Sequence, residues 1–500
     1  MSKKIWLNWH SCLGLKLSLL MLIIFITGTI AVVSHEIDWL IDSDLRIEKS
    51  AQAINWDAMA ANIKQEYPQR QLTFINRPLY SNAASIALTI DPLLGARRVY
   101  LNPYSGNIIA DKAWYASVQR VFRDLHRYLL SPIAGIYLVG PFAIILLGSL
   151  ITALLCYRKW WRGFFKLRLH NGARAFWGSL HKVTGLWSLW FVALIAITGV
   201  WYLLEAVIRD VGGDIQFNRP VQQAQQLNDR SIIEKQLLPS LAVKKAKAQF
   251  EHFTVATVAF PSDQKTPYYI TGFTKAPLVR ARSNNVFIDA ISGEVLFVRK
   301  TRQQNALEIW IDLADPLHFG DFAGLWTKII WFIFGLALCI LSASGIVIFL
   351  KRIKASNKAL SFPTEIWGKA RFVMYAILLI PLLSGGYVLA KANDWLPRAQ
   401  WVKNSVINID ENPALLLLAK RDEYFYLGVF TQCQCLMLPT ELAIVLKNGT
   451  SIAFKNHKEG FLGKSAKLLP AQLANMAYLE WRQNNKVRFK KPVDEIYLEL

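Results

Sequence analysis

Long apolar runs alternate with polar stretches along this chain. The five runs cover about residues 12–34, 129–156, 183–208, 325–350 and 372–392, and none has an acidic residue near its middle. A helix of roughly 20 apolar residues crosses the ~30 Å hydrocarbon core of a bilayer, so each run predicts a transmembrane helix. The stretches between them contain short β-like segments. The pattern predicts a membrane α-helical bundle with α+β domains outside the bilayer.

Positive charge orients the predicted helices. The net charge is +22. The connection 157–175 holds six basic residues and no acid, the connection 351–371 holds six against one acid, and Lys3 and Lys4 open the chain. By the positive-inside rule these parts face the cytoplasm, which puts the N-terminus there and the long connections outside. The basic excess is therefore topological. The chain has no interleaved basic-aromatic motif, which argues against nucleic acid as a partner. The partner expected from the apolar runs is membrane lipid.

The first run follows two lysines, as a signal peptide would. It is too long for one, and no small-residue cleavage site follows it, so we expect a retained anchor in a bacterial inner (cytoplasmic) membrane.

The third run repeats the first. Trp9–Ala31 and Ser179–Trp201 each carry His, then Gly four residues later, then an Ile-Thr-Gly that ends eighteen residues after the His. The matching residues are His10, Gly14, Ile26, Thr27 and Gly28 in one, and His181, Gly185, Ile197, Thr198 and Gly199 in the other. Eighteen residues make about five helical turns, so His and both glycines would share one stripe of a continuous helix. The glycines then leave a bare surface beside an imidazole; the alternative interpretation is a stripe for helix packing.

The outer stretches repeat as well. Val99–Ile109 predicts a hairpin that turns at Ser105-Gly106, and Val286–Phe297 predicts its counterpart at Ser292-Gly293. His126 precedes Lys159 by the same distance as His318 precedes Lys351. The chain is thus a tandem repeat of span, outer domain and span. Such a duplication typically builds a pseudo-two-fold bundle with its functional site where the repeats meet.

These patterns give the expected domain organisation. The transmembrane segments are 1–35, 121–157, 176–208, 317–351 and 372–392, with a kink expected at Gly140-Pro141. The outer domains are 36–120, with a strand at Ala84–Ile90, and 209–316. The cytoplasmic loops are 158–175 and 352–371, and an outer extension covers 393–500.

The extension has its own signals. Asn448-Gly449 predicts a type I′ hairpin and Pro470–Arg482 a short amphipathic helix. Cys433 and Cys435 could form a disulfide, which we rank first, remain free thiols or bind a metal. We interpret the other cysteines, Cys12, Cys156 and Cys339, as core residues of the spans.

The repeat sorts the eight histidines. His10 pairs with His181 at the cytoplasmic ends of spans, and His126 pairs with His318 at the outer ends. His35 lies at the outer end of the first span, on the stripe of His10, and has no counterpart in the second repeat. We interpret the remaining three as solvated residues of the connections: His170, His252 and His457.

Two imidazole pairs, one near each face of a helix bundle, suit bis-histidine b-type haem, whose iron takes axial ligands from facing helices. His126 with His318 is the favoured outer ligand pair; His35 with either of them is the alternative, and otherwise His35 contacts a propionate or substrate. Arg123 and Arg127 flank His126 and could bind propionates. The inner candidates for that role are Lys3, Lys4, Arg174 and Lys182. A zinc site fits less well because the histidines are isolated rather than clustered, and a proton relay fits less well because Asp and Glu are absent from the middle of every span.

At these motifs the chain resembles the PepSY-associated transmembrane proteins, over about residues 5–352. The shared features are the His-x-x-x-Gly-Leu opening, the Ile-Thr-Gly, the Ser-Gly hairpin and the Leu-His before the next span. Iron-regulated members of that family include di-haem ferric siderophore reductases of the ferrioxamine type. The resemblance implies four core helices, two periplasmic PepSY-like domains and two b haems held by His10, His126, His181 and His318. The fifth span and the extension depart from the family's minimal pattern.

Our leading expectation is therefore an oxidoreductase that reduces a periplasmic ferric siderophore with electrons from a cytoplasmic or quinol donor. No Gly-x-Gly-x-x-Gly follows a strand and no Walker loop is present, so we expect a separate donor. Candidate chelate contacts are Trp114, Trp395, Trp401, Arg280 and Arg282. Two other expectations remain open: a membrane-anchored PepSY module that regulates a periplasmic peptidase, and a permease for ferric chelates.

Overall fold

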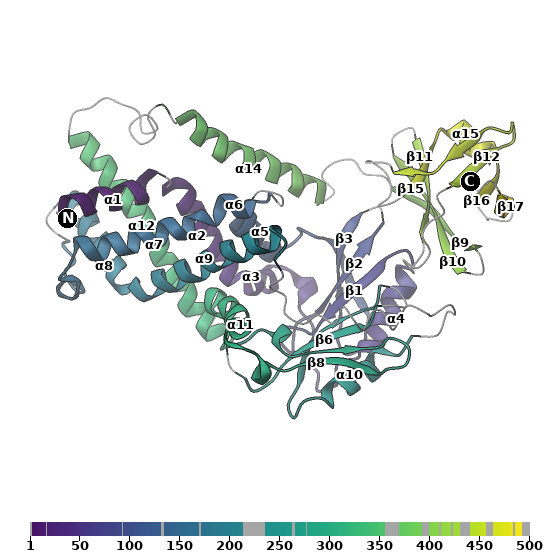
Figure 1. Cartoon of the computed structure of the whole chain (residues 1–500), viewed down its shortest axis with the longest axis horizontal. Coiled ribbons are helices and arrows are strands. Elements are labelled where there is room, and N and C mark those ends of the chain that lie inside the picture. The colour runs from purple at the N-terminus through teal and green to yellow at the C-terminus, as the bar shows by residue number, and fades with distance from the viewer. Residues whose placement is uncertain are drawn as a thin grey trace.

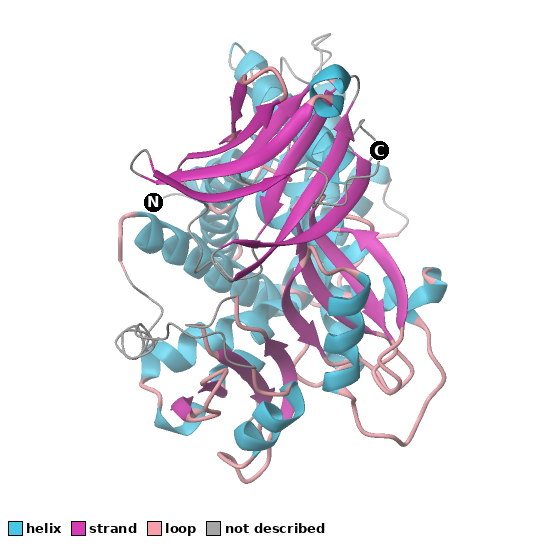
Figure 2. Ribbon diagram, turned by 90° about the vertical axis from the view of Figure 1, so that its right-hand side faces the viewer, coloured by secondary structure: helices cyan, strands magenta, loops and turns pink. Residues whose placement is uncertain are grey.

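A computed structural model gives the structure of the chain. It describes residues 3–492 except 17, 93, 132–134, 170, 171, 214–235, 263–265, 277, 356–368, 370, 393–399, 410, 411, 422, 423, 431–440, 457–463, 484 and 485. Figure 1 shows a bundle of helices that contains the N-terminus, an outer α/β region beside it, and a separate group of C-terminal strands. In Figure 2, seen from the right-hand side of Figure 1, the strands stand toward the viewer and the bundle helices lie behind them.

The bundle is built from the apolar runs. Its main helices are α1 (Lys3–Lys16), α2 (Ser18–Val32), α7 (Pro141–Cys156), α8 (Ala173–Trp187), α9 (Leu189–Asp210) and α12 (Leu325–Ala355). Among the described residues three helical segments are long and apolar enough to cross a membrane: Gly135–Cys156, Leu189–Asp210 and Leu325–Lys351. The bent pair α1 and α2 makes a fourth if it counts as one span. The fifth predicted span is a helix, α14 (Arg371–Ala392), whose crossing of the membrane stays a prediction.

Each repeat contributes equivalent contacts to the bundle. Helix α1 packs on α7, and its counterpart α8 packs on α12. Helix α2 packs on α12 and α9 packs on α7, so each repeat reaches across to the other. The shorter helices α5 (Val118–Tyr128) and α11 (Ala306–Phe319), which lead into the second and fourth spans, pack on α2 and α9 respectively. The arrangement agrees with the predicted tandem repeat.

The prediction of an uninterrupted helical stripe is wrong in the first repeat, and the second repeat has a one-residue break at the equivalent place. Helices α1 and α2 are bent by 62° relative to each other, and Ser188 separates α8 from α9 at the equivalent place. The Ser188 hydroxyl donates to the carbonyl of Thr184 at 2.8 Å, a bond that competes with the helix's own hydrogen bonds. His10 and Gly28 therefore lie on different helices. The second span is also divided as expected, since α6 (Gly135–Val139) ends before Gly140 and α7 begins at Pro141.

The two outer domains share one antiparallel sheet of eight strands in the order β4-β3-β2-β1-β5-β6-β7-β8. The first repeat supplies β1 (Gln71–Asn76), β2 (Ser85–Asp91), β3 (Gly95–Leu101) and β4 (Ile108–Ala113). The second supplies β5 (Thr254–Ala259), β6 (Tyr268–Phe273), β7 (Asn285–Ile288) and β8 (Val295–Arg299).

The halves join where β1 pairs with β5. Phe74 pairs with Ala259, Ile75 with Val258 and Asn76 with Thr257. The first strands of the two repeats thus pair symmetrically about the Ile75–Val258 pair, and both of these side chains are fully buried.

The core of the sheet lies under two equivalent helices. Helix α4 (Trp56–Glu66) brings Met59 and Ile63, α10 (Pro239–Lys247) brings Ala242 and Ala246, and all four side chains have an exposed fraction of 0%. Both predicted Ser-Gly hairpins are present, between β3 and β4 and between β7 and β8. The turn glycines Gly106 and Gly293 have positive φ angles, as such turns require. The short helix α3 (Ser34–Ile41) connects span 1 to this region.

The C-terminal extension forms two small sheets. One orders β14-β15-β11-β10-β9 and the other β13-β12-β16-β17. Their bounds are β9 Gln400–Ile409, β10 Asn412–Arg421, β11 Tyr424–Phe430, β12 Glu441–Leu446, β13 Ser451–Ala453, β14 Lys455–Asn456, β15 Lys464–Leu468, β16 Met476–Gln483 and β17 Lys486–Pro492, with helix α15 at Pro470–Ala474.

Two predictions for the extension need correction. The hairpin at Asn448-Gly449 exists, but only Gly449 has a positive φ, and Leu446 bonds Thr450 across a three-residue loop, so the turn is not type I′. The helix predicted for 470–482 ends at Ala474, because the residues from Met476 onward pair with β12 as a strand. Cys433, Cys435, Trp395, His170 and His457 lie outside the described residues.

None of the three cysteines predicted to be core residues forms a disulfide. Cys339 is half-buried against Thr29, and Cys156 is half-buried too. Cys12 is exposed on the surface of α1, so the core prediction is wrong for this residue.

Candidate functional site

Two histidines face each other across the inner part of the bundle. His10 on α1 and His181 on α8 have ring centroids 6.3 Å apart, with ring planes at 71°. His10 Nδ1 lies 3.0 Å from the carbonyl oxygen of Ser149 and 3.3 Å from Thr152 Oγ1. His181 Nδ1 lies 3.1 Å from the carbonyl oxygen of Leu341 and 2.9 Å from Ser344 Oγ. These partners occupy equivalent places in the second and fourth spans.

A second pair lies toward the outer ends of the spans. His126 on α5 and His318 on α11 have ring centroids 6.2 Å apart, with ring planes at 41°. His126 Nδ1 lies 2.9 Å from the carbonyl oxygen of Ile24, and His318 Nδ1 lies 2.8 Å from Thr198 Oγ1. The structure therefore brings together both histidine pairs that the repeat predicted, and pairs His126 with His318 rather than with His35.

The hydrogen bonds fix the same tautomer at all four rings. A carbonyl oxygen can only accept, so Nδ1 of His10, His126 and His181 carries the hydrogen. Thr198 Oγ1 donates to the Leu194 carbonyl at 2.8 Å, which leaves it to accept from His318. None of the four Nε2 atoms has a hydrogen-bond partner among the described residues. Each Nε2 lone pair is thus available to a metal.

The spacing suits one iron between each pair. Two metal–nitrogen bonds of about 2 Å and the two half-rings together span about 6 Å. The described residues hold no cluster of three or more His, Cys, Asp or Glu that could complete a protein-only metal site. A porphyrin needs only two protein ligands, because its own nitrogens supply the other four. The residues fit bis-histidine haem better than a bare ion.

A cavity of about 440 Å³ adjoins the outer pair. His126 and His318 line it together with apolar residues of α2, α7 and α9, among them Phe142, Ala143 and Ile195. The charged lining residues, here called the charged end of the cavity, come from α5, α11 and the turn after it, the outer domain, the last turns of α9 and the first turn of α12: Arg123, Arg127, Glu205, Arg280, Arg282, Asp315, Asp321 and Lys328. An apolar slot with a charged end matches an amphipathic planar ligand that carries carboxylates at one edge.

The arginines predicted to bind propionates lie in this cavity. Arg123 and Arg127 sit one turn apart on α5, on either side of His126 in sequence, and form no ion pair with a described acid. Both are therefore free to pair with carboxylates of a ligand.

The equivalent positions on α11 are Asp315 and Phe319. Asp315 is held by Arg280 at 3.2 Å and by Arg282 at 3.3 Å. At the first of these positions one repeat has an arginine and the other an aspartate. Carboxylates of a ligand would therefore bind on the α5 side of the cavity.

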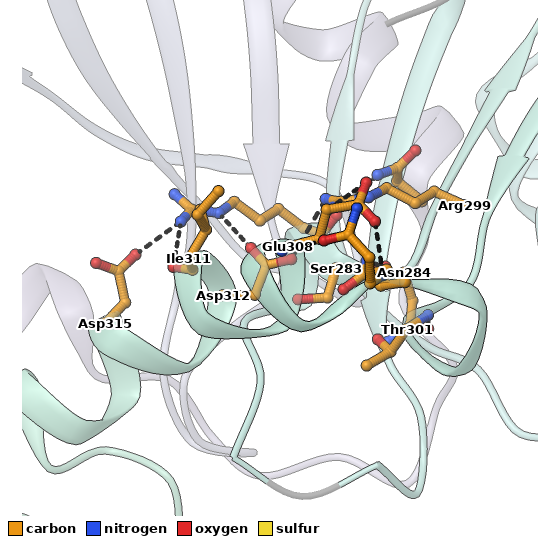
Figure 3. Close-up of polar contacts among 12 residues, drawn as sticks. Ser283, Asn284, Arg299, Thr301, Glu308, Ile311, Asp312 and Asp315 are labelled. Atoms are coloured by element: carbon orange, nitrogen blue, oxygen red, sulfur yellow. Dashed lines mark hydrogen bonds and ion pairs between the residues drawn. The ribbon is translucent and has the colours of Figure 1, made fainter. Parts of the chain in front are cut away.

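Arg280 and Arg282, predicted as chelate contacts, are engaged in ion pairs. Arg280 also bonds Asp321 at 3.2 Å, and Arg282 bonds Asp312 at 3.0 Å. Figure 3 shows Glu308, Asp312 and Asp315 spaced along α11 and facing the strand region that bears Arg299. Arg299 reaches both Asp312, at 3.3 Å, and Glu308, at 3.9 Å. This ladder fixes α11, and with it His318, to the outer sheet.

His35 lies at the charged end of the same cavity, beside Lys328 and Arg123 in its lining. The next residue, Glu36, binds Lys328 Nζ at 2.7 Å and the Tyr80 hydroxyl at 2.7 Å. Burial acts to raise the pKa of Glu36, but the hydrogen bonds from Lys328 and Tyr80 outweigh it and keep the pKa below its ordinary value. This group, which sequence reasoning missed, ties the outer domain to the start of the fourth span.

Tyr202 is a second residue that the sequence did not single out. Its ring contacts His318 edge-on, with centroids 5.1 Å apart, and its hydroxyl donates to Asp315 at 2.7 Å. The only available signal was a polar aromatic one turn after the Ile-Thr-Gly motif.

The glycines of the motif have separate roles. A Cβ on Gly28 would lie 2.6 Å from Cε1 of His126, so Gly28 makes room for the outer imidazole rather than for His10. A Cβ on Gly199 would instead meet Ala143 at 2.8 Å, which is a helix-packing contact. The surroundings of Gly14 lie outside the described residues.

Other predicted contacts are placed differently. Lys182, an inner propionate candidate, lies over the ring of Tyr157 at 4.8 Å. Trp114, a candidate chelate contact, stacks under Arg120 at 4.2 Å. His252 is exposed beside Glu251, as predicted for a solvated residue. The side chain of Trp401 lies outside the described residues.

Comparison with known proteins gives one family. The family model described as the PepSY-associated TM region matches residues 7–352, which include all four paired histidines. No curated protein matches the chain.

Proposed function

Because the chain belongs to the PepSY-associated TM family, we propose that it is an inner-membrane di-haem b protein that passes electrons outward to reduce a periplasmic ferric siderophore. The observation that carries the proposal is the pairing of His10 with His181 and of His126 with His318, at 6.3 and 6.2 Å between ring centroids. Each pair combines one histidine from either repeat. Bound haem would supply a one-electron carrier at each level.

The chain's own residues would hold the two groups at separate depths. On α7, residues Phe142 and Ala143 line the outer cavity, whereas Ser149 and Thr152 bond His10. The cavity lining on α7 reaches Leu146, and Ser149, which bonds His10, lies about 4.5 Å further along the helix axis. Apolar side chains such as Phe191, Trp331 and Leu338 pack together in the bundle and keep water out.

At the outer site Arg123 and Arg127 would bind the two carboxylates of the porphyrin. Guanidinium–carboxylate bonds are charge-assisted and directional, so they would set the orientation of the group as well as its affinity. The ion pairs of Arg280, Arg282 and Lys328 leave these cations occupied. The charge at the end of the cavity would then be close to balanced once the ligand is in place.

The overall reaction transfers one electron per ferric ion. The electron comes from a cytoplasmic one-electron reductant, or from a quinol that is oxidised to quinone over two turnovers and releases two protons. The electron reduces Fe(III) in the external chelate to Fe(II). Hard oxygen ligands hold the divalent ion less tightly than the trivalent one, so reduction releases the iron. The absence of dinucleotide and nucleoside-triphosphate motifs from the sequence favours a separate donor.

The test starts with the purified full-length protein. We expect a b-type absorption spectrum and two haems per chain by pyridine haemochrome assay. Proteoliposomes with a reductant sealed inside should reduce an external ferric hydroxamate chelate, and a ferrous-specific dye should report it. Colourless protein from haem-replete cells would sink the proposal and favour the peptidase-regulating module. Uptake of intact ferric chelate without reduction would sink it in favour of the permease.

A further inference from the structure

We infer that the hydroxyl of Thr198 tunes the outer site: it accepts the Nδ1 hydrogen of His318, the one of the four histidines that has no carbonyl partner among the described residues, and so gives the iron that His318 binds a higher reduction potential than a carbonyl acceptor would. The inference rests on the proposed function. It gives the two sites different potentials and makes outward transfer the downhill direction.

The contrast among the four histidines is the basis. His10, His126 and His181 each have a backbone carbonyl oxygen within 3.1 Å of Nδ1. Two of them also have a hydroxyl nearby, Thr152 Oγ1 at 3.3 Å from His10 and Ser344 Oγ at 2.9 Å from His181, but neither depends on it alone. The only partner of His318 Nδ1 among the described residues is Thr198 Oγ1, at 2.8 Å.

The repeat supplies an internal comparison. Thr27 and Thr198 are the same residue of the same Ile-Thr-Gly motif. Thr27 Oγ1 donates to the carbonyls of Ile23 and Ile24, and it is the Ile24 carbonyl that receives His126. Thr198 Oγ1 donates likewise to Leu194 and Ile195, yet here the hydroxyl itself receives the histidine. One motif therefore makes two different contacts to its imidazole.

The acceptor decides how much electron density the ligand gives the metal. A strong acceptor draws the Nδ1 hydrogen away, makes the imidazole more basic and stabilises the ferric state. The oxygen of an alcohol hydroxyl is an intrinsically weaker acceptor than the oxygen of an amide carbonyl. His318 should therefore donate less electron density to its iron than His126, His10 or His181 do. This stabilises the ferrous state at the outer site.

The surroundings keep His318 on this acceptor. Thr198 is fully buried, so water does not compete for the bond. Tyr202 packs against the edge of the imidazole, and the ion pairs of Asp312 and Asp315 fix α11. The ring cannot turn to a carbonyl without breaking these contacts.

The experiment is a redox titration of the full-length protein in detergent, with the potential of the outer centre followed in the absorption spectrum. Thr198→Val removes the hydroxyl at nearly constant shape, and Thr27→Val makes the same change in the other repeat as a matched control. Titration in a His181→Ala background, which should retain only the outer haem, assigns the potential to the outer site.

We expect Thr198→Val to raise the outer potential, because His318 then loses its acceptor altogether. Thr27→Val should not raise it, because the Ile24 carbonyl then loses a competing donor and still accepts from His126. Thr198→Ser, which restores a hydroxyl, should return it to the wild-type value. Low-spin ferric EPR signals of the outer centre should shift in Thr198→Val alone. Equal potentials and spectra for the two valine variants would overturn the inference, and so would a lower potential in Thr198→Val. A wild-type protein without b haem would refute the proposed function itself, and that result is recognisable before any variant is made.

Discussion

Gly28 lies directly against the imidazole of His126: a Cβ on this glycine would come within 2.6 Å of Cε1 and 2.8 Å of Nδ1. The ring is held in place by its bond to the Ile24 carbonyl one turn earlier on the same helix. The glycine of the first Ile-Thr-Gly motif is therefore part of the outer site.

The first prediction concerns this contact. Gly28→Ala should push His126 away from its partner, because Cβ contacts below 3.0 Å require a shift, and the protein should lose about half of its haem. The matched control is Gly178→Ala on α8, where a Cβ meets nothing within 4 Å. The control should retain full haem and gain up to ~1 kcal/mol of helix stability. Equal haem content in the two variants would contradict the assignment of Gly28.

The second prediction separates the two sites. His181→Ala should lose about half of the haem and all transfer across the membrane, since His10 is left without its partner across the iron. Haem per chain and reduction of external chelate by proteoliposomes measure both effects. His252→Ala, in an exposed connection, is the control and should match the wild type. Full haem in His181→Ala would remove this residue from the site.

The third prediction decides the role of His35. His126 and His318 face each other, and His35 lies at the charged end of the cavity. Because the iron already has two ligands, His35→Ala should keep both haems. A haem content close to two per chain with an unchanged bis-histidine spectrum is the expected result. Loss of one haem from this variant would instead support ligation by His35.

The fourth prediction tests the free arginines. Arg123→Gln and Arg127→Gln should each speed the loss of the outer haem, since a charge-assisted bond contributes about 1.5–3 kcal/mol, or roughly a tenfold to hundredfold effect. Transfer of haem to an excess of a haem-scavenging protein measures the rate. Arg209→Gln is the control, because Arg209 is about half exposed and pairs with Asp210 at the surface. Rates that match this control would show that the arginines do not hold the group.

The fifth prediction concerns the anchoring of α11. Asp312 has a side-chain exposure of 1% and forms ion pairs with both Arg282 and Arg299. Asp312→Ala should destabilise the protein by about 1.5–3 kcal/mol, because it removes the charge-assisted hydrogen bond from Arg282, while Arg282 keeps Asp315 and Arg299 keeps Glu308. Thermal unfolding in detergent measures it. Glu251→Ala removes the exposed partner of His252 and should change the stability by less than ~1 kcal/mol. An unfolding temperature equal to that of this control would refute the anchoring role.

The sequence predicted which histidines lie together better than it predicted the helices that carry them. Duplication alone paired His10 with His181 and His126 with His318, because equivalent residues of two repeats meet at a shared axis. The spacing of the motif did not reveal the bend between α1 and α2 or the break at Ser188, since a local change in a helix leaves no periodic signal in the sequence. A continuous helix would have placed Gly28 on the same face as His10, and so the sequence associated this glycine with the wrong histidine.

Long-range pairing was equally hidden. The joining of β1 to β5 depends on contacts between segments far apart in the chain, and nothing in Gln71–Asn76 alone indicates its partner. The contrast between Thr27 and Thr198 is invisible in sequence as well, because the two motifs are identical and differ only in where the facing histidine lies. The strand at Met476–Gln483 overrode a local helical pattern through its pairing with β12.

The symmetric pairing around Ile75 and Val258 has a consequence for how such a chain can be divided. Either half on its own would carry one imidazole of each pair and would expose the edge of its first strand, a surface that invites pairing with another chain. Two identical halves would have to dimerise about that axis to become complete, and every substitution would then appear twice. Fusion into a single polypeptide removes that constraint, so one helix can carry Arg123 while its twin carries Asp315.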